Sequence, residues 1–201
     1  MLKLYYAPGA CSLSPHIALR EAGLQFELDR VDFKQGKKTE SGGHLTDANP
    51  KGYVPALVLD DGQVLTEGAV IVQYVADLAP DARLAPPLGT FERVRLQEWL
   101  NFIATELHKG LSPLYSPLAS DEYKQAVKDR LALRLGFMEQ SLASKSYLLG
   151  ERFTVADGYA FYALRSWQNL THGTLSGNLA AYFARIGARP AVQAALLAEG
   201  L

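Results

Sequence analysis

The hydrophobic positions of the first 79 residues alternate between strand-like runs and helical spacing. Residues 54–59 and 64–65 flank an Asp-Asp-Gly-Gln turn, which favours a β-hairpin. In the next segment Ile71, Tyr74 and Val75 recur three and four residues apart, as on one face of a helix. The predicted elements are strand Leu2–Tyr6, helix Ser12–Ala22, strand Phe26–Val31, hairpin strands Val54–Leu59 and Val64–Leu65, and helix Glu67–Leu78. This order predicts a small mixed sheet covered by helices.

The rest of the chain has helical spacing only. A stretch rich in proline and alanine, residues 79–90, favours a linker. Beyond it we predict one long helix over Thr90–Leu111, a second over Ser120–Leu142 capped by Ser120, and three shorter helical segments. The apolar face of the first long helix consists of Leu96, Leu100, Ile103, Leu107 and Leu111. The predicted fold class is α/β plus all-α, with an α/β domain over 1–79, a linker over 80–90 and an all-helical domain over 91–201.

Composition and charge narrow the classes of protein to consider. With 48% hydrophobic and 20% charged residues, the chain has the composition of a soluble globular protein. A net charge of −1 gives no electrostatic basis for binding nucleic acid or an anionic membrane, and no apolar run approaches membrane-spanning length. The single cysteine excludes an internal disulfide and favours a cytoplasmic location. The four histidines are scattered without metal-ligand spacing, so we expect no metal.

The single cysteine, Cys11, lies between the first predicted strand and the first predicted helix. A helix that begins near Ser12 would direct unpaired backbone N–H groups at this thiol and favour its thiolate form. Pro15 fits the first turn of such a helix, where its missing N–H has no consequence. From position alone, the favoured interpretation of Cys11 is a small buried hydrophobic residue, which is what most lone cysteines are.

The segment Asn49–Gly68 contains two further candidate features. Val54-Pro55 begins a predicted strand, so this proline indicates either a cis bond that exposes the Val54 backbone or a simple strand start. Glu67-Gly68 lies at a helix start, where the Gly68 N–H can bind a carboxylate and Glu67 can accept from an ammonium group. The alternative for Glu67 is an acidic residue that serves only the helix dipole.

Five segments together resemble a known family over essentially the whole chain. They are YYAPGACSLSPHIALREAG, NPKGYVPAL, LTEG, WLNFIATELHKG and AVQAALLAEGL. In combination they resemble the glutathione S-transferases, and in particular the bacterial beta class, which has cysteine where other classes use tyrosine or serine. The resemblance implies a thioredoxin-like first domain, glutathione as co-substrate, no tightly bound cofactor, and a homodimer.

The resemblance also implies a role for individual residues. Cys11 would lie against the glutathione sulfur, and the Val54 backbone would pair with the cysteinyl unit. Glu67 and Gly68 would hold the γ-glutamyl ammonium and carboxylate, although many members have serine where this chain has Gly68. Lys37 would meet the glycyl carboxylate, with Lys34 and Lys38 as alternatives in the same loop.

The Thr90–Leu111 helix supplies a second group of candidates. Asn101, Thr105 and His108 are spaced four and three apart, which predicts a shared polar face that stays uncharged until Lys109. We interpret it as one wall of a cleft between the domains, with Asn101, Thr105 and Lys109 at the glutathione and His108 as a catalytic residue near the thiol. An ordinary surface or capping histidine is the alternative for His108. Tyr115 and Trp167 are expected to line the electrophile pocket.

Thr154 and Asp157 have the spacing of a capping box before an apolar run, so we assign Asp157 to folding and not to catalysis. The expected activity is transfer of the glutathione thiol to electrophilic small molecules, including halogenated or xenobiotic ones, as in detoxification. A thiol-disulfide oxidoreductase or a reductive dehalogenase on the same scaffold is the alternative. A non-enzymatic binding module is a weaker one.

Overall fold

In the computed structural model, which describes residues 1–201, the first apolar run forms the central strand of a five-stranded sheet. The strand order is β3-β2-β1-β4-β5; β1 and β2 are parallel, and the other pairs are antiparallel. The bounds are β1 Leu2–Tyr6, β2 Phe26–Asp32, β3 Lys38–Thr39, β4 Ala56–Val58 and β5 Val64–Thr66. The predicted mixed sheet and hairpin are confirmed, whereas the two-residue β3 was not predicted.

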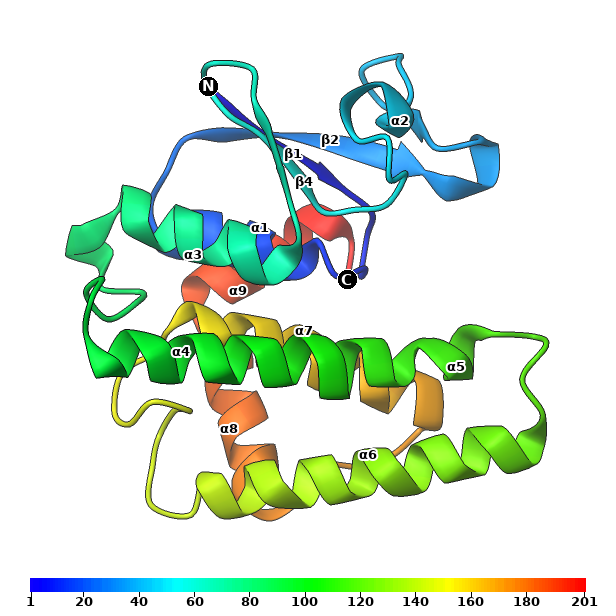
Figure 1. Cartoon of the computed structure of the whole chain (residues 1–201), viewed down its shortest axis with the longest axis vertical. Helices are drawn as coiled ribbons and strands as arrows, with labels where there is room; N and C mark the ends of the chain where they lie inside the picture. Colours follow the sequence, from blue (N-terminus) through cyan, green and yellow to red (C-terminus); the bar gives the residue numbers. More distant parts are fainter. The chain divides into compact units, whose positions relative to one another are not determined.

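Helices α1 (Leu13–Glu21), α3 (Gly68–Leu78) and α9 (Pro190–Glu199) form a layer on one side of this sheet, and α2 (Leu45–Ala48) lies on the other (Figure 1). α1 packs against both α3 and α9. A short η1 helix covers Phe33–Gln35. η2 covers Pro80–Ala82, within the stretch where we expected no helix.

Tertiary contacts divide the chain into unit 1, Met1–Ala85 with Pro190–Leu201, and unit 2, Pro86–Arg189. The position of the last twelve residues therefore differs from our expectation, which placed them in the all-helical domain. α9 buries Val192 and Ala195 completely, and its principal neighbour is α1 of unit 1. Helical periodicity identifies an apolar face but not the element on which that face packs, so the sequence could not assign α9 to its unit.

Unit 2 is helical throughout. It comprises α4 (Phe91–Phe102), η3 (Ile103–His108), η4 (Lys109–Leu111), α5 (Ser112–Tyr115), α6 (Asp121–Ser141), α7 (Val155–Thr171) and α8 (Gly177–Gly187). Thr90 and Ser120 cap α4 and α6 by accepting from Arg93 and Tyr123 N–H groups, both at 3.2 Å. α7 is the core helix of the unit, because eleven of its residues are buried. The predicted all-helical region is confirmed.

The helix predicted over Thr90–Leu111 is not a continuous α-helix. From Ile103 to His108 it is a π-helix, and from Lys109 to Leu111 a 3₁₀-helix. A π-turn advances fewer degrees per residue than an α-turn, so residues four and three apart no longer align as predicted. The leucine stripe nevertheless stays buried through Leu111.

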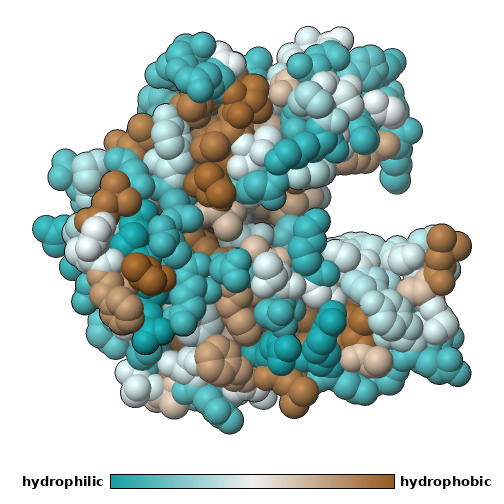
Figure 2. Space-filling view, viewed as in Figure 1, coloured by the Kyte–Doolittle hydropathy of each residue, from teal (hydrophilic) through white to brown (hydrophobic).

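On the face drawn in Figure 2, hydrophilic surface predominates on the helical unit and hydrophobic residues form separate patches. No helix combines the length and the apolar character that crossing a membrane requires.

Candidate functional site

The loop that precedes β4, residues 49–55, organises the candidate site of unit 1. Asn49 is buried and holds the loop in shape: its Nδ2 donates to the Tyr53 carbonyl at 2.7 Å, and its Oδ1 accepts from the Lys51 N–H at 3.2 Å. The bond between Val54 and Pro55 is cis, and β4 begins directly after it. Of the two interpretations of this proline, the structure selects the cis bond.

Cys11 meets this loop at Val54. Its Sγ donates a hydrogen bond to the Val54 carbonyl oxygen at 3.1 Å, and the cysteine is partly buried. The unpaired N–H groups expected at the thiol do not include those of Leu13 and Ser14, which have partners. The Leu13 and Ser14 N–H groups donate to the carbonyls of Ala10 and Cys11, at 3.0 and 3.2 Å. A tight turn before α1 thus pairs these two N–H groups, and the thiol itself donates to the Val54 carbonyl.

Glu67 is held by two residues of the same loop. Its Oε1 accepts from Lys51 Nζ at 2.8 Å and from the Tyr53 hydroxyl at 2.7 Å, while Lys51 also donates to Thr66 Oγ1 at 2.9 Å. The hydrogen bonds to Glu67 raise the pKa of both Lys51 and Tyr53. Glu67 is the N-cap of α3 with φ of +69°, a region that non-glycine residues seldom adopt and that is concentrated at functional sites.

Gly68 is the first residue of α3, so its N–H is among those that have no partner within the helix. The Glu67 carboxylate and this helix start are therefore adjacent, as predicted. Lys51 and Tyr53 were not predicted, because nothing in their spacing from Glu67 indicates contact; only the loop conformation brings them there.

Among the three loop lysines, Lys37 lies against the same loop. A Cβ placed on Gly52 would be 2.5 Å from Lys37 Nζ, so the amino group occupies the space beside this glycine. Gly52 itself has φ of +69°. Lys34 lies in η1 and Lys38 in β3, both exposed. The structure thus brings Lys37, Val54, Cys11 and Glu67 together around residues 49–55.

A buried network from α9 supports the turn that carries Cys11. Glu199 Oε2 accepts from the Gly9 N–H at 2.8 Å, and its Oε1 lies 2.8 Å from His16 Nδ1. Arg20 Nε donates to His16 Nε2 at 2.8 Å. Because Nε2 is an acceptor, the His16 ring is neutral and carries its proton on Nδ1, which donates to Glu199. Glu199 was not predicted as part of this network because it lies 183 positions from His16 in the chain.

In unit 2 the candidate His108 contacts two tyrosines of α7. Its Nδ1 lies 2.8 Å from the Tyr159 hydroxyl, and its ring makes edge contacts with Tyr159 and Tyr162 at centroid distances of 5.8 and 5.1 Å. Burial, and secondarily the positive charge of Lys109, lower the pKa of His108 to about 4. The imidazole is therefore neutral near pH 7 and acts as a hydrogen-bonding group, not as a cation.

This pKa predicts a pH dependence of stability. The unfolded chain binds a proton at His108 near pH 6.5, whereas the folded chain does so only near pH 4. Stability therefore falls as the pH is lowered from 6.5 towards 4. Between pH 7.5 and 4.5 we expect the wild type to lose about 1–3 kcal/mol relative to His108→Gln, measured by urea unfolding. Tyr159→Phe should keep the wild-type dependence, because burial is the main cause. Parallel profiles of wild type and His108→Gln would contradict the assignment.

The other candidates of unit 2 are only partly brought together. Thr105 Oγ1 donates to the Asn101 carbonyl at 3.0 Å, and both residues and Lys109 are exposed. Tyr115 is 60% exposed at the end of α5. Trp167 instead borders a small apolar cavity of about 10 Å³ together with Leu107 and Leu131. No cluster of three or more metal-ligating side chains occurs in the structure.

Comparison with known proteins identifies the family. Residues 9–78 match the glutathione S-transferase N-terminal domain, and residues 102–190 match its C-terminal domain. The chain is 48% identical to glutathione S-transferase GstA of Escherichia coli O157:H7, with 100% of both chains covered. It is 38% identical to glutathione S-transferase GST-4.5 of Xanthomonas campestris pv. campestris, again with 100% of both covered.

Solved structures agree with this result. A ternary complex of BphK, a bacterial glutathione S-transferase, has 57% identity and a TM-score of 0.95, covering 99% of this chain and 100% of that one. A sphingomonad glutathione S-transferase complexed with glutathione has 44% identity and a TM-score of 0.94, with 99% of both chains covered. A bacterial beta-class enzyme from Sphingomonas chungbukensis has 46% identity and a TM-score of 0.91, with 99% of both covered. The thioredoxin-like unit, the helical unit and these likenesses together show that the chain belongs to the glutathione S-transferase family.

Proposed function

We propose that the protein is a glutathione transferase, which binds glutathione and joins its sulfur to an electrophilic small molecule. The observation that carries the proposal is the convergence of Cys11, Val54, Lys37 and Glu67 on one loop. These groups offer a thiol, a backbone amide, an ammonium and a carboxylate, which complement the parts of a tripeptide that has one thiol, one ammonium and two carboxylates.

The roles within unit 1 follow from this complementarity. The Val54 carbonyl has two lone pairs, so it can accept from a ligand N–H while Cys11 donates to it. Lys51 and Tyr53 hold the Glu67 carboxylate in place, and this carboxylate is the group of the loop that can accept from the ammonium of the ligand. The Gly68 N–H at the start of α3 suits the neighbouring carboxylate. Lys37 suits the distal carboxylate, with its ammonium beside Gly52.

The assignment of unit 2 residues rests on the family resemblance. We propose His108 as the group that orients the glutathione sulfur through a neutral imidazole nitrogen. Nδ1 is engaged by Tyr159, so Nε2 is the atom that would serve. We also propose that Asn101, Thr105 and Lys109 contact glutathione. The residues that line the electrophile pocket would belong to this unit as well.

Three broader features complete the proposal: a cytoplasmic location, a part in detoxification, and a homodimer. The single cysteine supports the first. For the dimer, the support besides the resemblance is an aromatic cluster of Trp99, Phe102 and Phe137 on α4 and α6, with ring centroids 5.5–5.7 Å apart. Phe137 is 51% exposed, and aromatic residues of this kind are enriched at protein interfaces.

The experiment that tests the proposal is glutathione binding by Glu67→Ala. This change leaves the ligand ammonium without its charge-assisted partner, so we expect affinity to fall by about 1–3 kcal/mol, or roughly 5- to 150-fold. Isothermal titration calorimetry measures the loss. Glu27→Ala, at an exposed position on β2, is the matched control and should bind as the wild type does. Unchanged affinity in Glu67→Ala would remove this residue from the site.

A further inference from the structure

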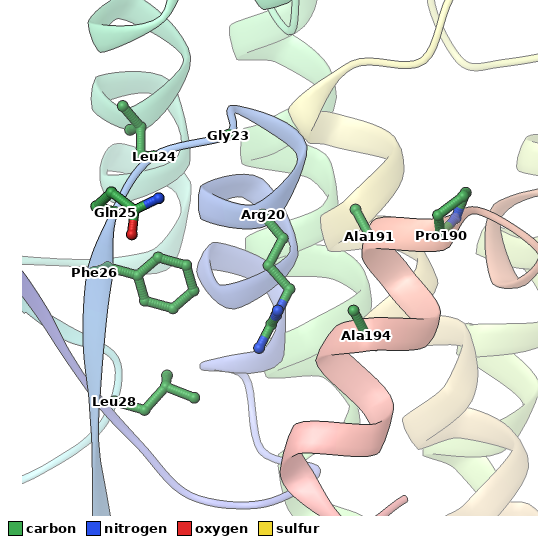
Figure 3. Close-up of a pocket in the computed structure, with 9 residues that line it drawn as sticks. All are labelled: Arg20, Gly23, Leu24, Gln25, Phe26, Leu28, Pro190, Ala191 and Ala194. Carbon is green, nitrogen blue, oxygen red and sulfur yellow. The ribbon is translucent and has the colours of Figure 1, made fainter.

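A hollow of unit 1 lies on the side of α1 that faces β2 and α9 (Figure 3). Its volume is about 580 Å³, within the range of sites that hold small ligands. The Phe26 and Leu28 side chains point into it from the strand, and Ala191 and Ala194 face it from α9. It shares no residue with the proposed glutathione site.

Arg20 extends into the middle of this hollow (Figure 3). Its guanidinium carbon lies 5.7 Å from the centre of the Phe26 ring, and its Nε donates to His16. The His16 and Glu199 side chains beyond it are completely buried. Arg20 is thus positioned by a neutral ring and not by direct contact with a carboxylate.

The polar groups around the hollow favour an anion with a single charge. The backbone N–H groups of Gly23 and Leu24 already donate to the carbonyls of Arg20 and Leu19. The remaining side-chain donors of the lining are the Arg20 guanidinium and the Gln25 amide, and the lining contains no acidic residue. The other lining side chains are apolar: Leu24, Phe26, Leu28, Pro190, Ala191 and Ala194.

We propose that this hollow is a binding site for an amphipathic monocarboxylate, an aryl or alkyl acid. A guanidinium presents its donors in a planar fork that matches a carboxylate, and the apolar wall would cover the hydrocarbon part. The single guanidinium balances one negative charge and the neutral amide adds only a hydrogen bond, so a phosphate dianion is a poorer match. A neutral hydrocarbon would leave Arg20 without a counter-ion.

The test is calorimetric titration of the full chain with 2-naphthoate and decanoate, and with 2-naphthylmethanol as the neutral analogue, in the presence of saturating glutathione. We expect the acids to bind about tenfold or more tightly than the alcohol, because only they pair with Arg20. Arg20→Gln should abolish this preference. Ala194→Leu, which adds bulk to the wall of the hollow at a residue outside the hydrogen-bonded network of His16 and Glu199, should weaken the acids and the alcohol alike. Arg30→Gln, an exposed arginine elsewhere on β2, should bind as the wild type does.

The two acids separate the sources of the ligand. Binding of 2-naphthoate alone assigns aryl acids to the hollow, binding of decanoate alone assigns alkyl acids, and either result supports the site. The proposal is overturned if neither acid binds, if glutathione displaces them, or if both Arg20→Gln and Ala194→Leu bind them as the wild type does. Because Ala194 makes none of the hydrogen bonds of the buried network, a folding defect in Arg20→Gln does not prevent the test.

Discussion

Replacing Asp157 with alanine is expected to lower the free energy of unfolding by about 3–5 kcal/mol, the range for breaking a buried charged network by removing one partner. Asp157 is completely buried at the start of α7. Its Oδ1 accepts from the Leu148 N–H at 2.9 Å and from the Tyr182 hydroxyl at 2.8 Å. Its Oδ2 accepts from the N–H and the hydroxyl of Thr154, at 2.7 and 2.9 Å.

The size of this effect follows from what the alanine leaves behind. Burial raises the pKa of Asp157, and its hydrogen bonds oppose that shift, so they compensate the loss of water. Without the carboxylate, two backbone N–H groups and a buried tyrosine hydroxyl lose their partner. Asp157 therefore ties together the start of α7, the segment before it and α8, which is more than a capping box requires.

Urea unfolding at one protein concentration and pH 7.5 measures the effect. Tyr182→Phe removes only one donor and should lower stability by about 1 kcal/mol. Asp129→Ala is the control, because Asp129 is exposed on α6 and accepts only from Gln125, so its loss should stay within about 0.5 kcal/mol. A fully stable Asp157→Ala protein without transferase activity would show instead that Asp157 has a catalytic role.

Periodicity predicted most of the fold because many of its elements bury one face and expose the other. The strands around Leu4 and Leu57 and the stripe from Leu96 to Leu111 are buried as their patterns require. Two of the features that were not predicted show the limit of periodicity. The sequence of the π-turn at Ile103–His108 has the apolar spacing of an ordinary helix. No residue of α9 indicates that this helix packs against α1. The placement of α9 depends on its contacts with α1, a segment far away in the chain.

The candidate site likewise combines residues that could be predicted from the sequence with residues that could not. Cys11, Val54 and Glu67 were predicted from local motifs, and the structure places them around one loop. The partners that hold them were not predicted: Lys51 and Tyr53 at Glu67, and Glu199 behind Gly9. Such partners belong to ordinary residue types, and only the folded chain brings them within hydrogen-bonding distance.

Cys11→Ala is expected to keep glutathione-conjugating activity while its disulfide-exchange activity falls by about 100-fold or more. Conjugation requires only a stabilised glutathione thiolate, which backbone and polar groups can supply without a protein thiol. Exchange through the protein requires that Cys11 attack a disulfide substrate, form a mixed disulfide and release a thiolate. Glutathione then attacks the substrate sulfur of this mixed disulfide, which frees Cys11 and leaves the substrate joined to glutathione.

The measurement is paired kinetics on one electrophile and one small disulfide, with glutathione affinity determined for each variant. Cys11→Ser is the matched control, because a hydroxyl can still donate to the Val54 carbonyl but cannot form a disulfide. We expect Cys11→Ser to resemble Cys11→Ala in exchange. His108→Ala should lower both rates by about 100-fold if its imidazole serves the glutathione sulfur in each reaction. Loss of both activities in Cys11→Ala with unchanged glutathione affinity would instead make Cys11 the obligatory nucleophile, since conjugation would then also pass through its sulfur.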